Sequence, residues 1–237
     1  MGIGSEFDFT GERFVPGRSG KKIELDHMER YIFAQQYAKG KKILDIACGS
    51  GYAANIFLDS GAKEYTGVDI SKHSIQYAKK HYSSDSASFI VGDICNFNTK
   101  ETFDLIVCFE TIEHVECYSK ALKNLSSMLS DNGVLLISSP NRKVTSPRAL
   151  SIQDTPKNPY HTQEFLIDEL KEELLSAGFK IKEKSVYGQR QRWLYDNKLF
   201  HYFVRLTRFP DFFAYVSSPK IRRVKGLTPR YFIIVAR

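Results

Sequence analysis

Two glutamates and two histidines have the residue types and spacing needed for acid–base or metal chemistry. Glu110, Glu113 and His114 stand at i, i+3 and i+4, so a helical turn would place them on one face. His161 lies in a later polar loop. A histidine has a pKa near working pH, so His114 or His161, assisted by Glu113, could remove a proton from a substrate hydroxyl.

The same four residues allow two further interpretations. A divalent metal bound by Glu110, Glu113, His114 and His161 would lower the pKa of a substrate hydroxyl. Alternatively, Glu113 and His114 only shape a loop and cap the next helix. The residue pattern leaves all three interpretations open.

A glycine-rich turn is the sharpest motif, in the stretch LDIACGSGY over residues 44–52. Glycines allow a tight turn and close approach of a ligand. Asp69 and Asp93 end the next two predicted strands, at the edge where open α/β sheets bind ligands. Asp69 can accept hydrogen bonds from both hydroxyls of a ribose. Asp93, with the amide of Ile94, can recognise an adenine edge.

A nicotinamide dinucleotide is the rival ligand for this turn. The dinucleotide pattern G-x-G-x-x-G has a third glycine, where this chain has Ala54, a tolerated variant. A dinucleotide needs neither Asp45 nor Asp93. Asp45 suits a ligand that bears an ammonium group. Because S-adenosylmethionine carries an ammonium and a sulfonium but no phosphate, the pattern favours S-adenosylmethionine.

Residues 40–140 resemble the class I S-adenosylmethionine-dependent methyltransferases. The resemblance implies a methyltransferase enzyme that uses S-adenosylmethionine and releases S-adenosylhomocysteine. It also implies a seven-stranded sheet whose last strand is antiparallel. The cofactor contacts that it implies are Asp45, Ala47, Gly49, Gly51, Asp69, Ile70, Asp93, Ile94 and Phe109.

Two further resemblances concern the start of the chain and the glutamate–histidine run. Residues 10–16 and 27–31 are similar to the entry segment of bacterial members associated with glycan biosynthesis, in which a helix covers the cofactor. Arg30 and Tyr31 are therefore expected cofactor contacts. The E-x-x-E-H run resembles the metal-binding pattern of small-RNA 2′-O-methyltransferases and quinone O-methyltransferases, which implies a divalent metal as a second cofactor.

The elements that position these residues alternate along the chain. Short apolar runs predict strands, and segments with a period of 3.6 predict helices. The predicted strands are 42–47, 65–69, 87–91, 103–108, 134–138, 179–187 and 231–235, and the predicted helices are 52–58, 71–81, 118–129 and 162–177. This alternation predicts an α/β fold with a doubly wound, mostly parallel sheet. We expect a single domain over 8–237, with a cofactor-covering segment 8–40, a cofactor-binding core 41–140 and an insertion 189–229.

Positive charge is concentrated near the end of the chain. The net charge is +7, and residues 188–237 hold 11 Lys and Arg against 2 Asp and Glu. Arginine can clamp phosphate, and aromatic rings can stack on sugars or bases. The residues of this kind in the insertion are Arg190, Arg192, Trp193, Tyr195, Phe200, Tyr202, Phe203, Arg205 and Arg208.

The expected acceptor is a small molecule, such as a sugar or a phosphate-bearing glycan precursor, methylated on oxygen. Oxygen is favoured because the histidines offer a base, and the Asn-Pro-Pro-Tyr motif of many amino-group methylating relatives is absent. The alternatives are RNA ribose 2′-O-methylation by stacking on single strands, contact with an anionic membrane surface, and a non-catalytic cofactor-binding module. No apolar run approaches the roughly 20 residues that cross a bilayer, so we expect a cytoplasmic protein. The oligomeric state is left open.

Overall fold

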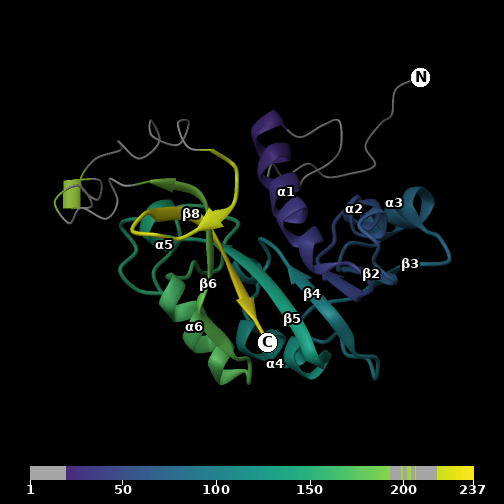
Figure 1. Ribbon diagram of the computed structural model, residues 1–237. Helices are drawn as coiled ribbons and strands as arrows, with labels where there is room; N and C mark the ends of the chain where they lie inside the picture. Colours follow the sequence, from purple (N-terminus) through teal and green to yellow (C-terminus); the bar gives the residue numbers. More distant parts are fainter. Residues whose placement is uncertain (1–19, 193–198, 200–201, 204–205, 207–217) are drawn as a thin grey trace. The chain divides into compact units, whose positions relative to one another are not determined.

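The chain forms two compact units. The computed structural model describes residues 20–192, 199, 202, 203, 206 and 218–237 (Figure 1). One unit comprises Met1–Val107 with Ser127–Gly133, and the other comprises Cys108–Ser126 with Val134–Arg237. Residues 8–19 of the expected covering segment, and Trp193, Tyr195, Phe200, Arg205 and Arg208 of the expected insertion, lie outside the described residues.

The first unit has parallel strands joined by helices. Its elements are α1 (Lys21–Ala34), η1 (Gln35–Tyr37), β1 (Lys42–Ile46), α2 (Ala53–Asp59), β2 (Glu64–Asp69), α3 (Lys72–Tyr82), β3 (Ala87–Val91) and β4 (Phe103–Cys108), whose last residue belongs to the second unit. In β1 and β2 Lys42 is opposite Glu64, and in β2 and β3 Tyr65 is opposite Ala87. The three strands lie in the order β3-β2-β1. Parallel pairing follows from the helical crossovers, because a short hairpin can join only antiparallel strands.

Apolar side chains hold the first unit together. Leu44 of β1 and Ala54 of α2 are completely buried. The rings of Phe57 and Tyr65 stack with centroids 6.0 Å apart, and Phe89 lies 5.8 Å from Tyr65. Burial of apolar surface stabilises the folded chain by about 25 cal/mol per Å². These contacts fix α2, which begins directly after the glycine-rich turn, against β2.

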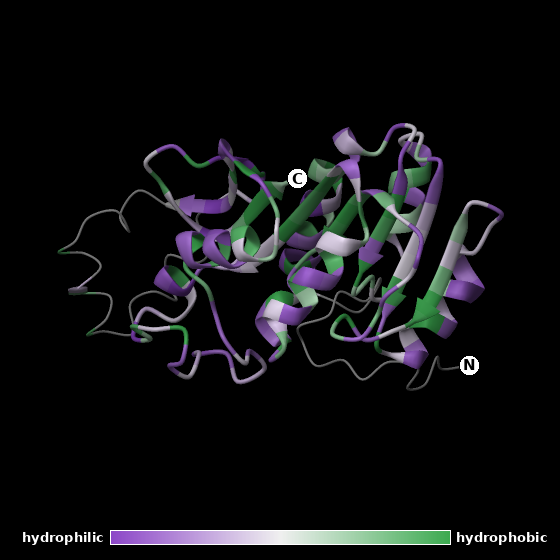
Figure 2. Ribbon diagram, turned by 90° about the horizontal axis from the view of Figure 1, so that it is seen from below, coloured by the Kyte–Doolittle hydropathy of each residue, from purple (hydrophilic) through white to green (hydrophobic). Residues whose placement is uncertain are grey.

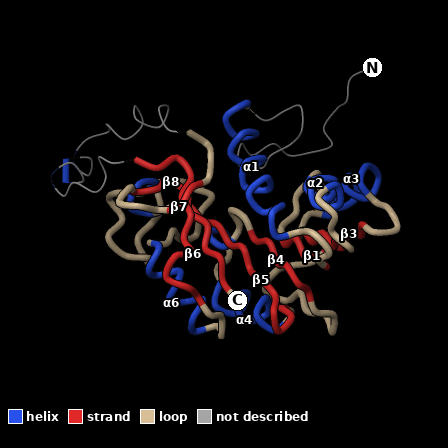
Figure 3. Tube along the Cα trace, in the orientation of Figure 1, coloured by secondary structure: helices blue, strands red, loops and turns tan. Residues whose placement is uncertain are grey.

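The second unit is built on antiparallel strands. Its elements are η2 (Ile112–His114), α4 (Tyr118–Ser127), β5 (Leu129–Pro140), α5 (Arg142–Thr145), α6 (Ile167–Ser176), β6 (Ile181–Arg192), β7 (Arg222–Arg223) and β8 (Thr228–Ala236), of which Ser127 and the first five residues of β5 belong to the first unit. β8 pairs antiparallel with β5 on one side and with β6 on the other (Figure 3). Phe232, Ile233 and Ile234 are buried one after another, as expected for a central strand covered on both faces. Apolar residues are concentrated on the strands, whereas the helices carry many polar residues (Figure 2).

The structure confirms the predicted α/β class, with mostly parallel strands and antiparallel last strands. Eight strands are described instead of the expected seven, because Arg222 and Arg223 pair with Gly188 and Tyr187 as the short strand β7. The expected insertion is thus partly regular, since its first residues extend β6 to Arg192. Along the described chain, no helix combines the length and apolar character needed to cross a membrane. The single-domain boundaries stay a prediction.

The helix predicted from residue 162 begins later, at Ile167. Asn141 and Phe165 form an isolated parallel bridge, which keeps the chain extended up to Leu166. The amide of Leu166 then donates to the Glu169 carboxylate, 2.8 Å away, and so caps the helix. A tertiary contact, absent from the local periodicity, sets this boundary.

Gly51→Ala should destabilise the protein by about 2–4 kcal/mol. The residue has φ +80°, and an added Cβ would lie 2.6 Å from the Ala78 Cβ and 2.7 Å from Phe89, so overpacking adds to backbone strain. Urea unfolding measures the change. The control is Gly40→Ala, which has φ +71° and no atom within 4 Å of its added Cβ, and should cost only about 1 kcal/mol. Equal losses in the two variants would contradict the packing argument.

Candidate functional site

The turn between β1 and α2 is held in a conformation that few sequences adopt. Ala47, Gly49 and Gly51 have φ values of +61°, +57° and +80°. Glycine accepts such values readily, but at Ala47 the left-handed conformation costs about 1–2 kcal/mol. The amide of Cys48 donates to the Val68 carbonyl at 2.9 Å, which holds this conformation. Strain of this kind is typical of ligand-binding turns, and the glycine pattern alone did not reveal it at Ala47.

The two glycines of the turn serve different purposes. An added Cβ on Gly51 would collide with the side chains of Ala78 and Phe89, so Gly51 is required for packing. An added Cβ on Gly49 would meet nothing within 4 Å. The open side of Gly49 is therefore a place where a ligand can approach the backbone.

Asp69, at the end of β2, fixes the glycine-rich turn. Its Oδ2 accepts a hydrogen bond from the Gly49 amide at 2.9 Å, and its Oδ1 accepts one from the Ser71 amide at 2.8 Å. A carboxylate oxygen has more than one acceptor direction, so each can still accept from a ligand hydroxyl. Ile70, the next residue, is 63% exposed although apolar.

Asp93 follows β3 and organises its own turn. Its Oδ1 accepts from the Cys95 amide at 2.9 Å, and its Oδ2 accepts from the Asn96 side-chain amide at 3.1 Å. Asp93 is half-buried, and the neighbouring Ile94 is buried. Asp69 is thus the last residue of β2, and Asp93 lies two residues beyond the end of the neighbouring parallel strand β3.

Asp45 is completely buried beneath two tyrosines. Its Oδ2 accepts from the Tyr65 hydroxyl at 2.7 Å, and its Oδ1 accepts from the Tyr31 hydroxyl of α1 at 3.3 Å. Burial raises the pKa of Asp45 to about 7, against the lowering effect of the two hydroxyls. The Tyr31 ring packs edge-on against Tyr52, with centroids 5.3 Å apart. Tyr31 was among the expected site residues, with its buried neighbour Arg30; Tyr65 was missed, because it reads simply as an apolar strand residue.

The carboxylate of Glu110 is engaged away from the other predicted catalytic residues. Its Oε1 accepts from the Ser138 hydroxyl at 2.7 Å, and the oxygen of Ser138 accepts from the Glu110 amide at 3.0 Å. Glu110 has φ +47°, and Phe109 before it is buried. The backbone after β4 therefore turns sharply and directs Glu110 to β5.

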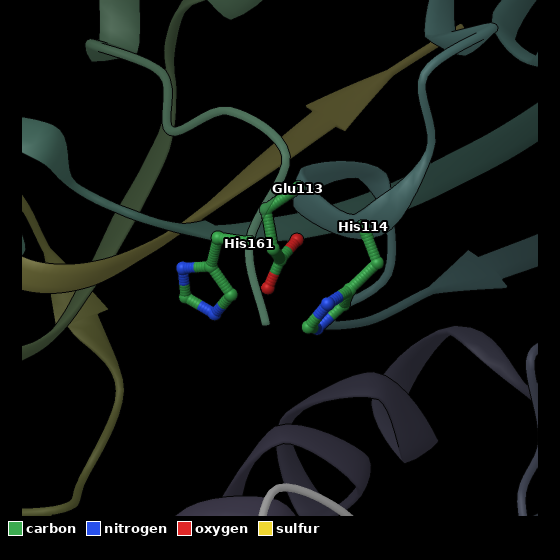
Figure 4. A group of neighbouring side chains, drawn as sticks. All are labelled: Glu113, His114 and His161. Carbon is green, nitrogen blue, oxygen red and sulfur yellow. The ribbon is translucent and has the colours of Figure 1, made fainter. Parts of the chain in front are cut away.

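Glu113, His114 and His161 lie together in the second unit. One ligand atom from each lies within 4.8 Å of the others, and the Glu113 carboxylate lies between the two rings in the view of Figure 4. The Glu113 carbonyl accepts from the amide and the hydroxyl of Thr162, both at 2.9 Å. This pairing ties η2 to the loop that carries His161, so the structure joins two segments that are distant in the sequence.

The hydrogen bond of His114 decides which of its nitrogens can take a proton. Its Nδ1 lies 2.8 Å from the Tyr160 carbonyl oxygen. A carbonyl oxygen only accepts, so Nδ1 carries the proton in the neutral ring and Nε2 carries the lone pair. Nε2 of His114 is thus the atom that could act as a base or bind a metal.

His161 is held differently from His114. Its Nδ1 lies 2.7 Å from the Glu164 carboxylate, and its Nε2 lies 2.9 Å from the Asn158 side-chain nitrogen. One carboxylate and two imidazoles form a suitable donor set for a divalent ion. As placed, however, His161 fits that set poorly, because it would have to give up one of these two contacts.

Asp45→Asn should remove a pH dependence of stability between about pH 4 and pH 7. The folded-state pKa is raised from 3.8 to about 7, so the stabilising contribution of the protonated group is complete below about pH 4. It is lost as pH rises through about 7, by up to about 1.4 kcal/mol per pH unit. Asparagine does not titrate, so the variant should gain stability relative to the natural chain at pH 8 more than at pH 5.

Urea unfolding at these two pH values measures the difference. Asp85→Asn, which changes an exposed carboxylate, serves as the control and should leave the pH profile as it is. The same profile in Asp45→Asn as in the natural chain would show that Asp45 is already ionised in the folded protein at pH 5.

Comparisons with known proteins identify the family and the fold. The family described as "Methyltransferase domain" matches residues 38–201. A probable S-adenosylmethionine-dependent methyltransferase of Mycolicibacterium smegmatis is 29% identical over 181 residues, which cover 76% of this chain and 68% of that protein. The mitochondrial ubiquinone biosynthesis O-methyltransferase of Schizosaccharomyces pombe is 35% identical over 133 residues, which cover 54% of this chain and 48% of that protein. The chain thus spans about half to two thirds of the length of these relatives.

A solved structure supports the fold. An S-adenosylmethionine-dependent methyltransferase from Mesorhizobium loti superposes with a TM-score of 0.61, and the alignment covers 90% of this chain and 99% of that one. Its sequence identity of 15% limits the comparison to the fold. The match over residues 38–201 shows the family: the chain belongs to the methyltransferase-domain family, and the expectation of a methyltransferase enzyme is confirmed.

Proposed function

We propose that this protein transfers a methyl group from S-adenosylmethionine to an oxygen atom of a small molecule. The observation that carries the proposal is the tautomer of His114: its Nδ1 donates to the Tyr160 carbonyl, so Nε2 can take the proton of an acceptor hydroxyl. Glu113, buried beside it, favours the protonated ring that results. The similarity to a ubiquinone biosynthesis O-methyltransferase supports an oxygen acceptor.

The first unit has the residues to hold S-adenosylmethionine. This cofactor supplies a methyl group already activated on a positively charged sulfur. Asp69, oriented by two backbone amides, would accept from the ribose hydroxyls. The open side of Gly49 leaves room beside the turn, and Asp93 and Ile94 would bind the adenine. The exposed apolar side chain of Ile70 would cover one face of the base.

Asp45 would act on the cofactor ammonium through Tyr31. Asp45 has no exposed surface, so direct contact with a ligand does not occur in the arrangement described. The Tyr31 hydroxyl donates to Asp45, and its oxygen can at the same time accept from an ammonium group. We therefore propose that the Tyr31 hydroxyl contacts the cofactor ammonium. Asp45, behind Tyr31, would supply the negative charge when it is ionised.

Positive charge in the expected insertion bears on the identity of the acceptor. Lys220, Arg222, Arg223 and Lys225 of the expected insertion are exposed, which supports an anionic acceptor such as a phosphate-bearing glycan precursor. RNA ribose methylation, contact with an anionic membrane and the cytoplasmic location stay predictions from the sequence. Metal assistance is a second candidate, because Glu113, His114 and His161 converge, but a metal would require His161 to release one of its two present contacts.

The cofactor assignment predicts that the purified protein binds S-adenosylmethionine and S-adenosylhomocysteine. Asp69→Asn should weaken both at least about tenfold, because an amide group accepts at one atom only. Isothermal titration calorimetry measures the change, with Asp85→Asn, on the exposed turn before β3, as the control. A natural chain that binds neither nucleoside would overturn the cofactor assignment.

The base assignment predicts that His114→Ala lowers turnover about 100- to 10,000-fold, the usual contribution of a general base. The assay follows labelled methyl transfer to a panel of phenols and phosphorylated sugars. His73→Ala changes an exposed histidine of α3 and should leave turnover as it is. Full activity of His114→Ala would refute the base.

The metal interpretation has its own measurement. If His114 acts as a base without a metal, turnover should stay within about twofold after dialysis against a strong chelator, since no Lewis acid is needed. Loss of activity on chelation, restored by Mg²⁺, Mn²⁺ or Zn²⁺, would instead establish the second candidate.

A further inference from the structure

The environment of His161 differs from that of His114 in a way that bears on the base proposed above. The side chain of His161 is 6% exposed, and that of its partner Glu164 is completely buried. The His161 Nδ1 lies 2.7 Å from the Glu164 Oε1. Burial of this kind excludes water from the contact, so the protein groups around the ring decide where its protons lie.

The orientation of the Asn158 amide fixes the proton on the other side of the ring. The Tyr160 amide donates to the Asn158 Oδ1 at 3.1 Å, which places the oxygen of the side-chain amide toward Tyr160. The nitrogen of that amide therefore faces the His161 Nε2, 2.9 Å away. An amide nitrogen can only donate, so Nε2 of His161 accepts and carries no proton.

The Glu164 carboxylate completes this assignment. Since Nε2 of His161 accepts, the proton of the neutral ring lies on Nδ1 and is donated to Glu164. The Thr145 hydroxyl donates to the second oxygen of Glu164. Burial alone raises the pKa of Glu164, but hydrogen bonds from His161, Thr145 and Ser146 outweigh it, and the pKa lies below its usual value. An ionised Glu164 accepts at both oxygens, which agrees with these contacts.

One residue sets the state of both rings. The Tyr160 amide fixes the Asn158 side chain, and the Tyr160 carbonyl accepts from the His114 Nδ1. The two imidazoles meet edge to face, with centroids 4.9 Å apart and planes at 80°. Both neutral rings therefore carry the proton on Nδ1, which is the less common tautomer of imidazole in water.

We propose that the two histidines have different roles: His114 is the base, and His161 is a positioning residue that Glu164 and Asn158 lock in one tautomer against the His114 ring. The role of His114 rests on the function proposed above, whereas the locked tautomer of His161 rests only on these hydrogen bonds. The sequence pattern assigned neither Glu164 nor Asn158 to the site. The lock would maintain the orientation of the His114 ring, as partners behind a working histidine commonly do.

Nitrogen NMR of the natural chain, labelled with ¹⁵N in histidine, tests the lock directly. We expect an unprotonated Nε2 and a protonated Nδ1 for His161 at neutral pH, assigned by loss of the signals in His161→Gln. Asn158→Asp keeps an oxygen for the Tyr160 amide but presents a second acceptor to the ring. In that variant the His161 Nε2 should gain a proton. A protonated Nε2 in the natural chain, or an unchanged Nε2 in Asn158→Asp, would overturn the proposal.

Turnover measurements on Glu164 variants distinguish the positioning of His161 from the role of His114 as the base. Glu164→Gln retains an oxygen that accepts from Nδ1, so we expect at most about a tenfold loss, with the tautomer kept. Glu164→Leu removes the acceptor and should lose turnover about 10- to 100-fold, the usual effect of removing such a partner, together with the tautomer signature. Glu172→Gln changes an exposed carboxylate of α6 and serves as the control.

The outcomes are distinguishable. If the tautomers are as described but His114→Ala keeps full turnover, the base is wrong and the lock stands. If Glu164→Leu folds and keeps the natural tautomer and rate, the lock is wrong whatever His114 does.

Discussion

The pair of hydrogen bonds that the Asp69 carboxylate accepts from the Gly49 and Ser71 amides is the interaction on which the first unit's site depends. It links the turn after β1 to the start of α3 after β2. Without it, three residues with positive φ would have no common support. Because the carboxylate is almost fully buried, loss of either amide would leave a charged oxygen without a donor, which is far more costly than loss of an exposed contact. The same side chain thus shapes the turn and presents the acceptors that a ribose would need.

Asp45 is a carboxyl group buried beside the glycine-rich turn, and its burial destabilises the ionised form. A carboxyl group removed from water is neutral up to an unusually high pH unless donors surround it. Tyr31 and Tyr65 provide two donors, one from α1 and one from β2. The N-terminal helix is therefore connected to the strand beneath the turn through a single buried carboxyl group. Burial outweighs these two donors, because the pKa of Asp45 is still raised to about 7.

In the second unit, a single loop, residues 158–163, holds the polar site residues of η2 in place. Residues 158–163 contact η2 through backbone and side-chain groups. These contacts include two hydrogen bonds that the side-chain nitrogen of Gln163 donates to the carbonyls of Ile112 and Val115, at 2.7 and 3.0 Å. These bonds hold Glu113 and His114 on a short 3-10 turn that could not persist alone. His114 is thereby placed against a main-chain carbonyl, whereas two side chains, Asn158 and Glu164, hold the His161 ring.

The sequence alone determined the α/β alternation, the glycine turn and the acidic residues at the ends of β2 and β3, because each depends on short-range periodicity or on the fixed edge of a parallel sheet. The sequence also identified Glu113, His114 and His161 as candidate site residues. Only the tertiary structure decided that Glu110 bonds to Ser138 rather than joining them, that Tyr65 supports Asp45, and that Arg222 and Arg223 add an eighth strand. The tautomers of the two histidines likewise depend on the tertiary structure. Each of these features depends on a partner distant in the chain, and a side chain's hydrogen-bond partner is not encoded in its local spacing.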